Sequence, residues 1–236
     1  YCPSWTLCAP KCLLTNKFHI VVPNSVSNEK NLLFKKGYFE VQDASSQLVA
    51  EYLDVAPGMK VIDTCAGAGG KTLHLASFMK NKGQIIAMDI YESKLKKLKI
   101  RARRNKVHNI DTRVIDSTKP IKKLYNKADR VLIDAPCSGI GVLRRNPDSK
   151  WKLQPEFLDN IKKVQQDILQ KYSKMVKSGG KLVYATCSVL PSENQNQITE
   201  FLASESGKDF KLIKDNKVFA HTSGFDGFYM ALLEKV

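Results

Sequence analysis

The sequence predicts an α/β fold built on a doubly wound, mainly parallel sheet that ends in an antiparallel C-terminal hairpin. From about residue 60 onward, short apolar runs typical of strands alternate with segments that carry apolar residues at helical spacing. This alternation favours a parallel sheet with helices packed on it. Near the end of the chain two apolar runs follow each other with no helical segment between them, which predicts the hairpin.

The elements follow in a regular order. We expect strands at 61–63, 84–88, 111–115, 131–133 and 182–184, and helices near 71–81, 91–104, 155–177 and 192–204. The hairpin strands are expected at 210–214 and 228–233, around a turn at 224–227. Residues 1–36 contain three prolines and three cysteines and do not follow the alternation, so they are expected to form a partial, appended module. The sequence therefore predicts a main domain at 37–236.

Composition and charge narrow the class of protein. The 236 residues are 43% hydrophobic, enough for a sizeable core, and carry a formal net charge of +15. A bias this large favours a polyanionic partner such as nucleic acid. No apolar run reaches the roughly 20 residues of a membrane span. Six cysteines without a regular framework favour a reducing, intracellular environment, and because the chain begins with Tyr1 we expect it to be trimmed or a fragment.

Basic residues are spread along the chain. Many lie in the expected helix 91–104, where a solvated helix face explains them as well as nucleic acid does. The adjacent Arg144 and Arg145 are more specific, because they follow a cysteine loop and are predicted to hold a phosphate of RNA beside the site.

A glycine-rich loop joins the strand at 61–63 to the next helix. It reads Asp63-Thr64-Cys65-Ala66-Gly67-Ala68-Gly69-Gly70-Lys71-Thr72. A phosphate-binding P-loop needs glycine where this chain has Cys65. The alternative is a nucleoside cofactor, with Asp89 at the end of the next strand on the ribose hydroxyls. Asp116, after the third strand, is expected on the adenine side of the same cleft.

Two further cysteines follow strand-like runs. Cys137 lies in Asp134-Ala135-Pro136-Cys137-Ser138-Gly139, and Cys187 lies in Ala185-Thr186-Cys187-Ser188. Either could be an inert core residue. Carboxyl ends of neighbouring parallel strands, however, bring side chains together where ligands bind. We therefore expect both thiols in one active site.

These segments, with the closing Asp226-Gly227-Phe228-Tyr229, resemble the RNA cytosine-5 methyltransferases of the Nop/Sun (Fmu) family. The resemblance runs from about Gly37 to the C-terminus, and the family's usual loop has proline where this chain has Ala68. It implies a class I, Rossmann-like methyltransferase fold that uses S-adenosyl-L-methionine. It also makes residues 1–36 part of an RNA-binding module.

The resemblance also implies roles for individual residues. Cys187 would add to C6 of cytosine, Asp134 would supply or share the proton at N3, and Cys137 would assist loss of the C5 proton and enzyme release. The cofactor would be held by Cys65, Ala66, Gly67, Ala68, Gly69, Gly70, Lys71, Asp89, Asp116 and Asp134. The RNA is expected to be ribosomal, with transfer RNA next, and the protein to be a monomer without a metal. It would be cytoplasmic in a bacterium and nucleolar or nuclear in a eukaryote.

Other interpretations remain. A catalytically idle RNA-binding assembly factor would keep the fold but would not need both thiols and Asp134. A DNA methyltransferase places its attacking thiol in a Pro-Cys motif without the second thiol. Cys2, Cys8 and Cys12 could be zinc ligands, but they lack a Cys-x-x-Cys pair. Trp151 is expected to be a packing anchor rather than a platform on which bases stack.

Overall fold

The computed structural model describes residues 5–8, 20–22 and 31–236. Most of the described chain is built around one seven-stranded sheet, in the order β6-β5-β4-β7-β8-β10-β9. Neighbouring strands from β6 to β8 are parallel, and β10 pairs antiparallel with both β8 and β9. The predicted α/β fold with its antiparallel C-terminal hairpin is therefore confirmed.

The strands of this sheet are β4 (Lys60–Asp63), β5 (Gln84–Asp89), β6 (Ile110–Val114), β7 (Ala128–Asp134), β8 (Val176–Thr186), β9 (Phe210–Val218) and β10 (Phe228–Lys235). The helices are α1 (Leu32–Lys35), α2 (Ala44–Leu53), α3 (Gly70–Phe78), α4 (Glu92–Arg104), α5 (Lys119–Lys122), α6 (Ser149–Lys152), α7 (Pro155–Tyr172), α8 (Gln195–Ala203) and α9 (Ala220–Ser223). Short 3₁₀ turns are η2 (Ile140–Val142), η3 (Ser173–Met175) and η4 (Pro191–Glu193).

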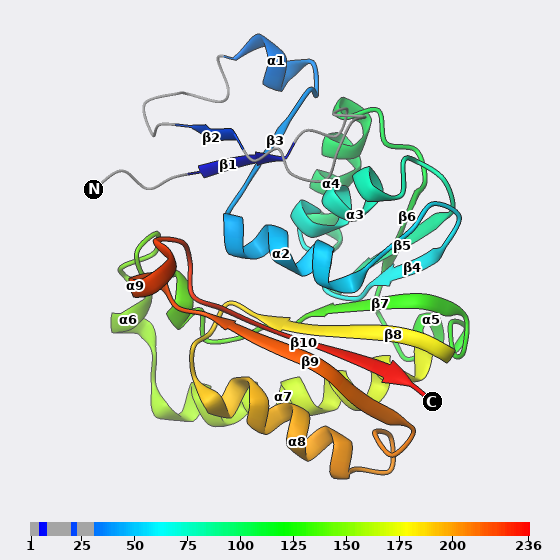
Figure 1. Cartoon of the computed structure of the whole chain (residues 1–236), viewed down its shortest axis with the longest axis vertical. Coiled ribbons are helices and arrows are strands. Elements are labelled where there is room, and N and C mark those ends of the chain that lie inside the picture. Colours follow the sequence, from blue (N-terminus) through cyan, green and yellow to red (C-terminus); the bar gives the residue numbers. More distant parts are fainter. Residues whose placement is uncertain (1–4, 9–19, 23–30) are drawn as a thin grey trace.

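Helices cover both faces of the sheet. In Figure 1, α2, α3 and α4 lie above it and α7 and α8 lie below. Successive strand residues point to opposite faces, so Val61 packs in the core under α2 and α3, whereas Ile62 packs with the α7 and α8 side. This two-sided burial explains why the central strands are apolar throughout rather than alternating.

The strand order reverses between β4 and β7. The chain runs outward from β4 through β5 to β6, then returns to β7 on the other side of β4 and continues to β8. In open α/β sheets, ligands bind beyond the carboxyl ends of the strands at such a reversal. The glycine loop follows β4 at this point, and the two cysteine loops follow β7 and β8.

The structure corrects two predictions, one about the bounds of a helix and one about a side chain. The helix expected at 155–177 ends at Tyr172, because Met175 and Val176 are buried and Val176 already pairs with Ala128 of β7. Their apolar side chains fit the helical spacing of the preceding residues, which is why the sequence predicted a longer helix. Pairing with β7 places Val176 in a strand instead. Trp151, expected to be a packing anchor, is 76% exposed, so that prediction is wrong.

A second, three-stranded sheet lies near the N-terminus. Here β1 (Trp5–Cys8) pairs antiparallel with β2 (Ile20–Val22) and with β3 (Glu40–Gln42). The Glu40 carboxylate accepts from Arg101 and Asn105 of the α4 region, which fixes β3 to the main domain. Thus β3 lies within the range predicted for the main domain but pairs with a strand of the predicted appended module.

Some predictions concern residues outside this description. Cys2 and Cys12 lie outside the described residues, and so does the side chain of Cys8. Within the described part, no helix is both long and apolar enough to span a bilayer.

Candidate active site

The two cysteine loops meet at the ends of adjacent strands. Strands β7 and β8 pair in parallel, with Asp134 opposite Ala185. The amide of Ala135 donates to the Ala185 carbonyl over 2.8 Å, and the amide of Gly141 donates to the Cys187 carbonyl over 2.9 Å. As a result the Sγ atoms of Cys137 and Cys187 lie 3.3 Å apart, so the structure brings the two predicted thiols together.

This contact makes the thiols chemically unequal. The hydrogen bond from Cys137 lowers the pKa of Cys187 below its usual value, with burial opposing this and the Lys71 charge assisting. The same hydrogen bond, together with burial, raises the pKa of Cys137. Of the two thiols, Cys187 therefore loses its proton more readily, and the thiolate is the nucleophilic form of cysteine.

Lys71 joins the glycine loop to the end of β7. Its Nζ lies 2.7 Å from Oδ2 of Asp134 and 4.9 Å from the centre of the Phe228 ring. Burial pulls the pKa of Lys71 down, but the nearby carboxylates of Asp134 and Asp63 outweigh it and the pKa is raised. A positive charge therefore lies between the glycine loop and the thiols.

Asp63, the last residue of β4, lies beneath this pair. It is buried and accepts a hydrogen bond from Thr72 Oγ1 over 2.7 Å. Burial raises the pKa of Asp63 to about 7, and the neighbouring Asp134 adds to the shift. Sequence analysis had not singled out Asp63 as an ionisable group of the site.

The glycine loop is shaped by Asp89 and by glycines. Asp89 is buried at the end of β5, where one carboxylate oxygen accepts from the amide of Gly67 and the other from the amide of Tyr91, each over 2.8 Å. A Cβ at Gly69, which has φ +88°, would lie 2.5 Å from Leu98. A Cβ at Gly67 or Gly70 would meet no atom within 4 Å. The loop therefore packs tightly on α4 and leaves open space beside two of its glycines.

Four other predicted cofactor residues lie along the same loop or nearby. Cys65 is partly buried against the core, where burial raises the pKa of its thiol, so it is not a reactive thiolate. Ala66 is buried, and its amide donates a hydrogen bond to the Met88 carbonyl. The Ala68 carbonyl accepts a hydrogen bond from Arg101. Asp116 is exposed beyond β6 and accepts a hydrogen bond from Ser117.

The two arginines after the Cys137 loop both contact the turn before β10. Arg145 donates through Nε to the buried carboxylate of Asp226 over 2.6 Å, and Arg144 donates to the Gly224 carbonyl over 2.6 Å. At this place the backbones of Gly141 and Gly227 touch, since a Cβ at Gly141 would lie 2.1 Å from the Gly227 carbonyl oxygen. The closing Asp-Gly-Phe-Tyr segment thus supports the Cys137 loop.

Sequence analysis also missed Glu193. This residue of η4 is fully buried, and its carboxylate accepts from both Ser138 and Ser188, the residues that follow the two thiols. An acidic residue shortly after the Cys187 loop was visible in the sequence. Nothing in the spacing showed that its side chain turns inward.

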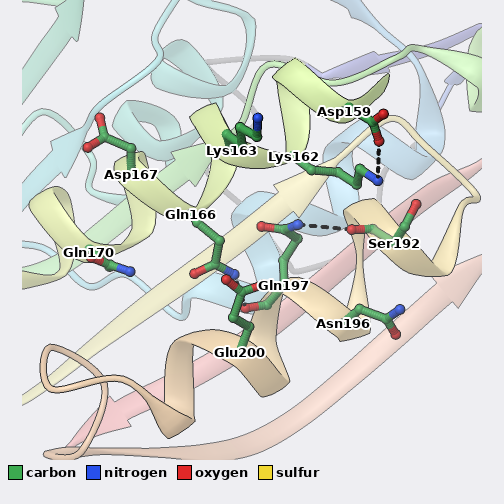
Figure 2. A pocket seen from close by; sticks show the side chains of 10 residues that line it. All are labelled: Asp159, Lys162, Lys163, Gln166, Asp167, Gln170, Ser192, Asn196, Gln197 and Glu200. Atoms are coloured by element: carbon green, nitrogen blue, oxygen red, sulfur yellow. Dashed lines mark hydrogen bonds and ion pairs between the residues drawn. The ribbon is translucent and has the colours of Figure 1, made fainter. Parts of the chain in front are cut away.

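A groove lies away from this site. It occupies about 690 Å³ between α7 and α8, and none of the predicted site residues lines it. Figure 2 shows Lys162 and Lys163 of α7 on one side and Gln197 of α8, whose amide donates to the Ser192 carbonyl, on the other. Within the part of the chain that the structure describes, no three His, Cys, Asp or Glu side chains gather as a metal site requires.

Comparisons with known proteins agree with this geometry. Residues 50–234 match the family model described as 16S rRNA methyltransferase RsmB/F. The ribosomal RNA small subunit methyltransferase B of Yersinia enterocolitica is 38% identical over 224 residues, which cover 92% of this chain and 51% of that protein. A probable ribosomal RNA small subunit methyltransferase B of Synechocystis is 37% identical and covers 86% of this chain and 49% of its own length.

Among solved structures, NSun6 from Pyrococcus horikoshii with SFG superposes with a TM-score of 0.81 at 28% identity, covering 93% of this chain and 60% of that one. The present chain spans about half the length of the curated relatives it matches. Because the family model covers most of the chain, the chain belongs to the RsmB/F family of rRNA methyltransferases.

Proposed function

We propose that this chain transfers a methyl group from S-adenosyl-L-methionine to C5 of a cytosine in RNA, through a covalent adduct between Cys187 and C6 of the base. The observation that carries the proposal is the pair of Sγ atoms 3.3 Å apart at the ends of adjacent parallel strands. C5 and C6 are neighbouring atoms of one ring, so a reaction that needs one thiol at each atom needs the thiols close together.

The residues of the glycine loop fit the proposed cofactor. Open space beside Gly67 and Gly70 lets a ligand approach the backbone at the start of α3, and glycine loops at helix N-termini bind nucleotide cofactors. The buried Asp89 oxygens each accept one amide and keep a second lone pair for a ribose hydroxyl. When bound, the cofactor supplies an electrophilic methyl group.

The protein's own residues prepare the base. Cytosine C5 is too electron-poor to take a methyl group unaided, and addition of a thiolate to C6 makes it nucleophilic. Cys187 is the better nucleophile because its pKa is lowered, and Cys137 keeps a proton because its pKa is raised. Once Cys187 is bonded to C6, Cys137 would lose its proton to water and, as a thiolate, accept the C5 proton. Loss of the C5 proton then lets the bond between C6 and Cys187 break, which returns Cys187 as a thiolate.

Asp134 would contact the N3 edge of the base. In the structure it is held by Lys71, whose raised pKa keeps its ammonium charged. The Lys71 ammonium therefore carries a proton next to the Asp134 carboxylate. The incoming base would share this proton at N3. The remaining carboxylate lone pairs would accept from the exocyclic amino group of cytosine, which distinguishes it from uracil.

Ribosomal RNA is the proposed substrate, with transfer RNA second. Relatives at 35–38% identity are named ribosomal RNA small subunit methyltransferase B, and SFG in the Pyrococcus structure is an analogue of the proposed cofactor. The net charge of +15 supports a polyanionic substrate. A ribosomal substrate would also place the protein inside the cell.

Methyl-labelled S-adenosyl-L-methionine incubated with the chain and with ribosomal or transfer RNA tests this function. Nuclease digestion should release labelled 5-methylcytidine. Label at another atom would overturn the cytosine-C5 assignment. RNA that binds without gaining label would favour the idle assembly factor, and label in duplex DNA would favour the DNA enzyme.

A further inference from the structure

We propose that Glu193 is a positioning residue that holds the Cys137 and Cys187 thiols at their working separation, an inference that rests on the proposed function. Glu193 is fully buried in η4, and its carboxylate contacts the serines that follow the two cysteines. It acts through the residues that follow the two cysteines.

The carboxylate is shared between the two cysteine loops. Oε1 accepts from the Ser138 amide over 2.8 Å, and Oε2 accepts from the Ser138 hydroxyl over 2.5 Å and from the Ser188 hydroxyl. The two hydroxyl oxygens lie 3.3 Å apart, the same spacing as the two Sγ atoms. Each thiol is therefore one residue from a side chain anchored on the same carboxylate.

Burying a carboxylate is costly unless hydrogen bonds satisfy it. A further donor to Glu193 is Gln165 of α7, whose amide reaches Oε1 over 3.1 Å and the Pro136 carbonyl over 2.9 Å. No lysine or arginine of the described residues forms an ion pair with Glu193. The hydrogen bonds that satisfy this buried carboxylate therefore come from the two loops and from Gln165, and removing the carboxylate leaves those buried donors without their partner.

Other contacts hold η4 without the carboxylate. The Tyr184 hydroxyl donates to the Glu193 backbone carbonyl over 2.8 Å. Asn194 accepts from Thr186 over 2.6 Å and donates to the Ser188 carbonyl over 3.0 Å. Loss of the Glu193 carboxylate thus spares the attachment of η4 to the Cys187 loop. It removes the side-chain link between the two cysteine loops that runs through Glu193, whereas the backbone hydrogen bond from Gly141 to Cys187 remains.

Thiol separation can be measured without any methylation. Diamide oxidises the protein by taking two electrons and two protons as Cys137 and Cys187 form an Sγ–Sγ bond, and mass spectrometry of linked peptides gives the rate. Glu193→Ala and Glu193→Gln should slow this bond about tenfold when compared at equal thiolate fraction, the equivalent of one charge-assisted hydrogen bond. Glu200→Gln, an exposed carboxylate of α8, is the matched control and should not change it.

Ser138→Ala and Ser188→Ala provide independent variants in case Glu193 substitutions do not fold. Each removes a hydroxyl donor, so each should slow the bond, and their effects should be non-additive with each other because one carboxylate joins them. Wild-type oxidation rates in folded Glu193 and serine variants would overturn the proposal.

Activity gives a second readout. Glu193→Gln should lower kcat for RNA methylation with KM for RNA unchanged. It should also accumulate protein–RNA adduct although both thiols are present, because Cys137 no longer lies where it can take the C5 proton. A higher KM without a change in kcat would contradict positioning. If the wild-type chain does not methylate RNA but Glu193 variants still oxidise slowly, the proposed function fails and the thiol positioning stands.

Discussion

The Nζ of Lys71 lies 2.7 Å from Oδ2 of Asp134, and this ion pair connects the loop after β4 with the end of β7. The two side chains are only 13% and 28% exposed, so water screens the pair weakly. It joins the segment proposed to bind the cofactor to the segment proposed to bind the base. The proposed cofactor site and the proposed base site are thus linked through one ion pair.

Lys71→Met should lower the rate of methyl transfer by about ten- to a hundredfold, the equivalent of a lost charged hydrogen bond. The variant loses the charge that helps lower the pKa of Cys187 and leaves Asp134 without its partner. Single-turnover transfer of labelled methyl groups to RNA measures it. Lys82→Met, an exposed lysine before β5, is the control, and equal rates for both variants would exclude a role for Lys71.

Asp89→Ala should weaken binding of S-adenosyl-L-methionine by about 1.5–3 kcal/mol, because a buried carboxylate that also holds the Gly67 amide is lost. Calorimetric titration decides it. Asp116→Ala should have a smaller effect, since that side chain is exposed. Wild-type affinity in the Asp89 variant would remove it from the cofactor site, and tight binding of ATP instead would support the P-loop alternative.

Asp63 makes stability depend on pH. Its pKa is raised from 3.8 to about 7, so between these values the folded protein binds more protons than the unfolded chain. Stability due to this group is therefore full below pH 4 and is lost as the pH rises to 7, by about 1.4 kcal/mol for each pKa unit. Urea unfolding of wild type and Asp63→Asn from pH 4.5 to 8 tests it. Wild type should lose stability relative to the variant as the pH rises, and a constant difference would contradict the shift.

RNA affinity should fall steeply with added salt if several phosphates are neutralised. Arg144→Ala should reduce the logarithmic slope by about one, and the double variant with Arg145→Ala by about one to two. Arg145→Ala should also destabilise the protein, because it leaves the buried Asp226 carboxylate without its cation. Lys208→Ala, at the far end of the sheet near Phe210, is the control. An unchanged slope in the arginine variants would mean that they serve the Asp226 turn alone.

The sheet and the thiols were predictable because their signals are local. An apolar run followed by Cys137 or Cys187 marks a strand end, and the fold rule for parallel sheets places such ends at one edge. The glycine loop was predictable for the same reason, and its fit to Asp89 follows from the order of two consecutive strands.

Contacts between distant segments were not predictable. The inward turn of Glu193 depends on Ser138, which lies 55 residues earlier in the chain. The end of α7 at Tyr172 depends on pairing between Val176 and Ala128. The buried Asp226 carboxylate depends on Arg145, 81 residues away. Each is set by tertiary packing that no periodicity in one segment encodes.

The most direct test of the account separates the two thiols. Purified Cys137→Ala and Cys187→Ala proteins are incubated with RNA and S-adenosyl-L-methionine, then resolved by denaturing electrophoresis. Cys137→Ala should still attack C6 and transfer the methyl group but fail to release the base, so a denaturant-resistant protein–RNA complex accumulates. Cys187→Ala, and the double variant, should form no complex and no 5-methylcytidine. Accumulation in Cys187→Ala instead would reverse the two roles, and normal methylation by both single variants would contradict the covalent mechanism.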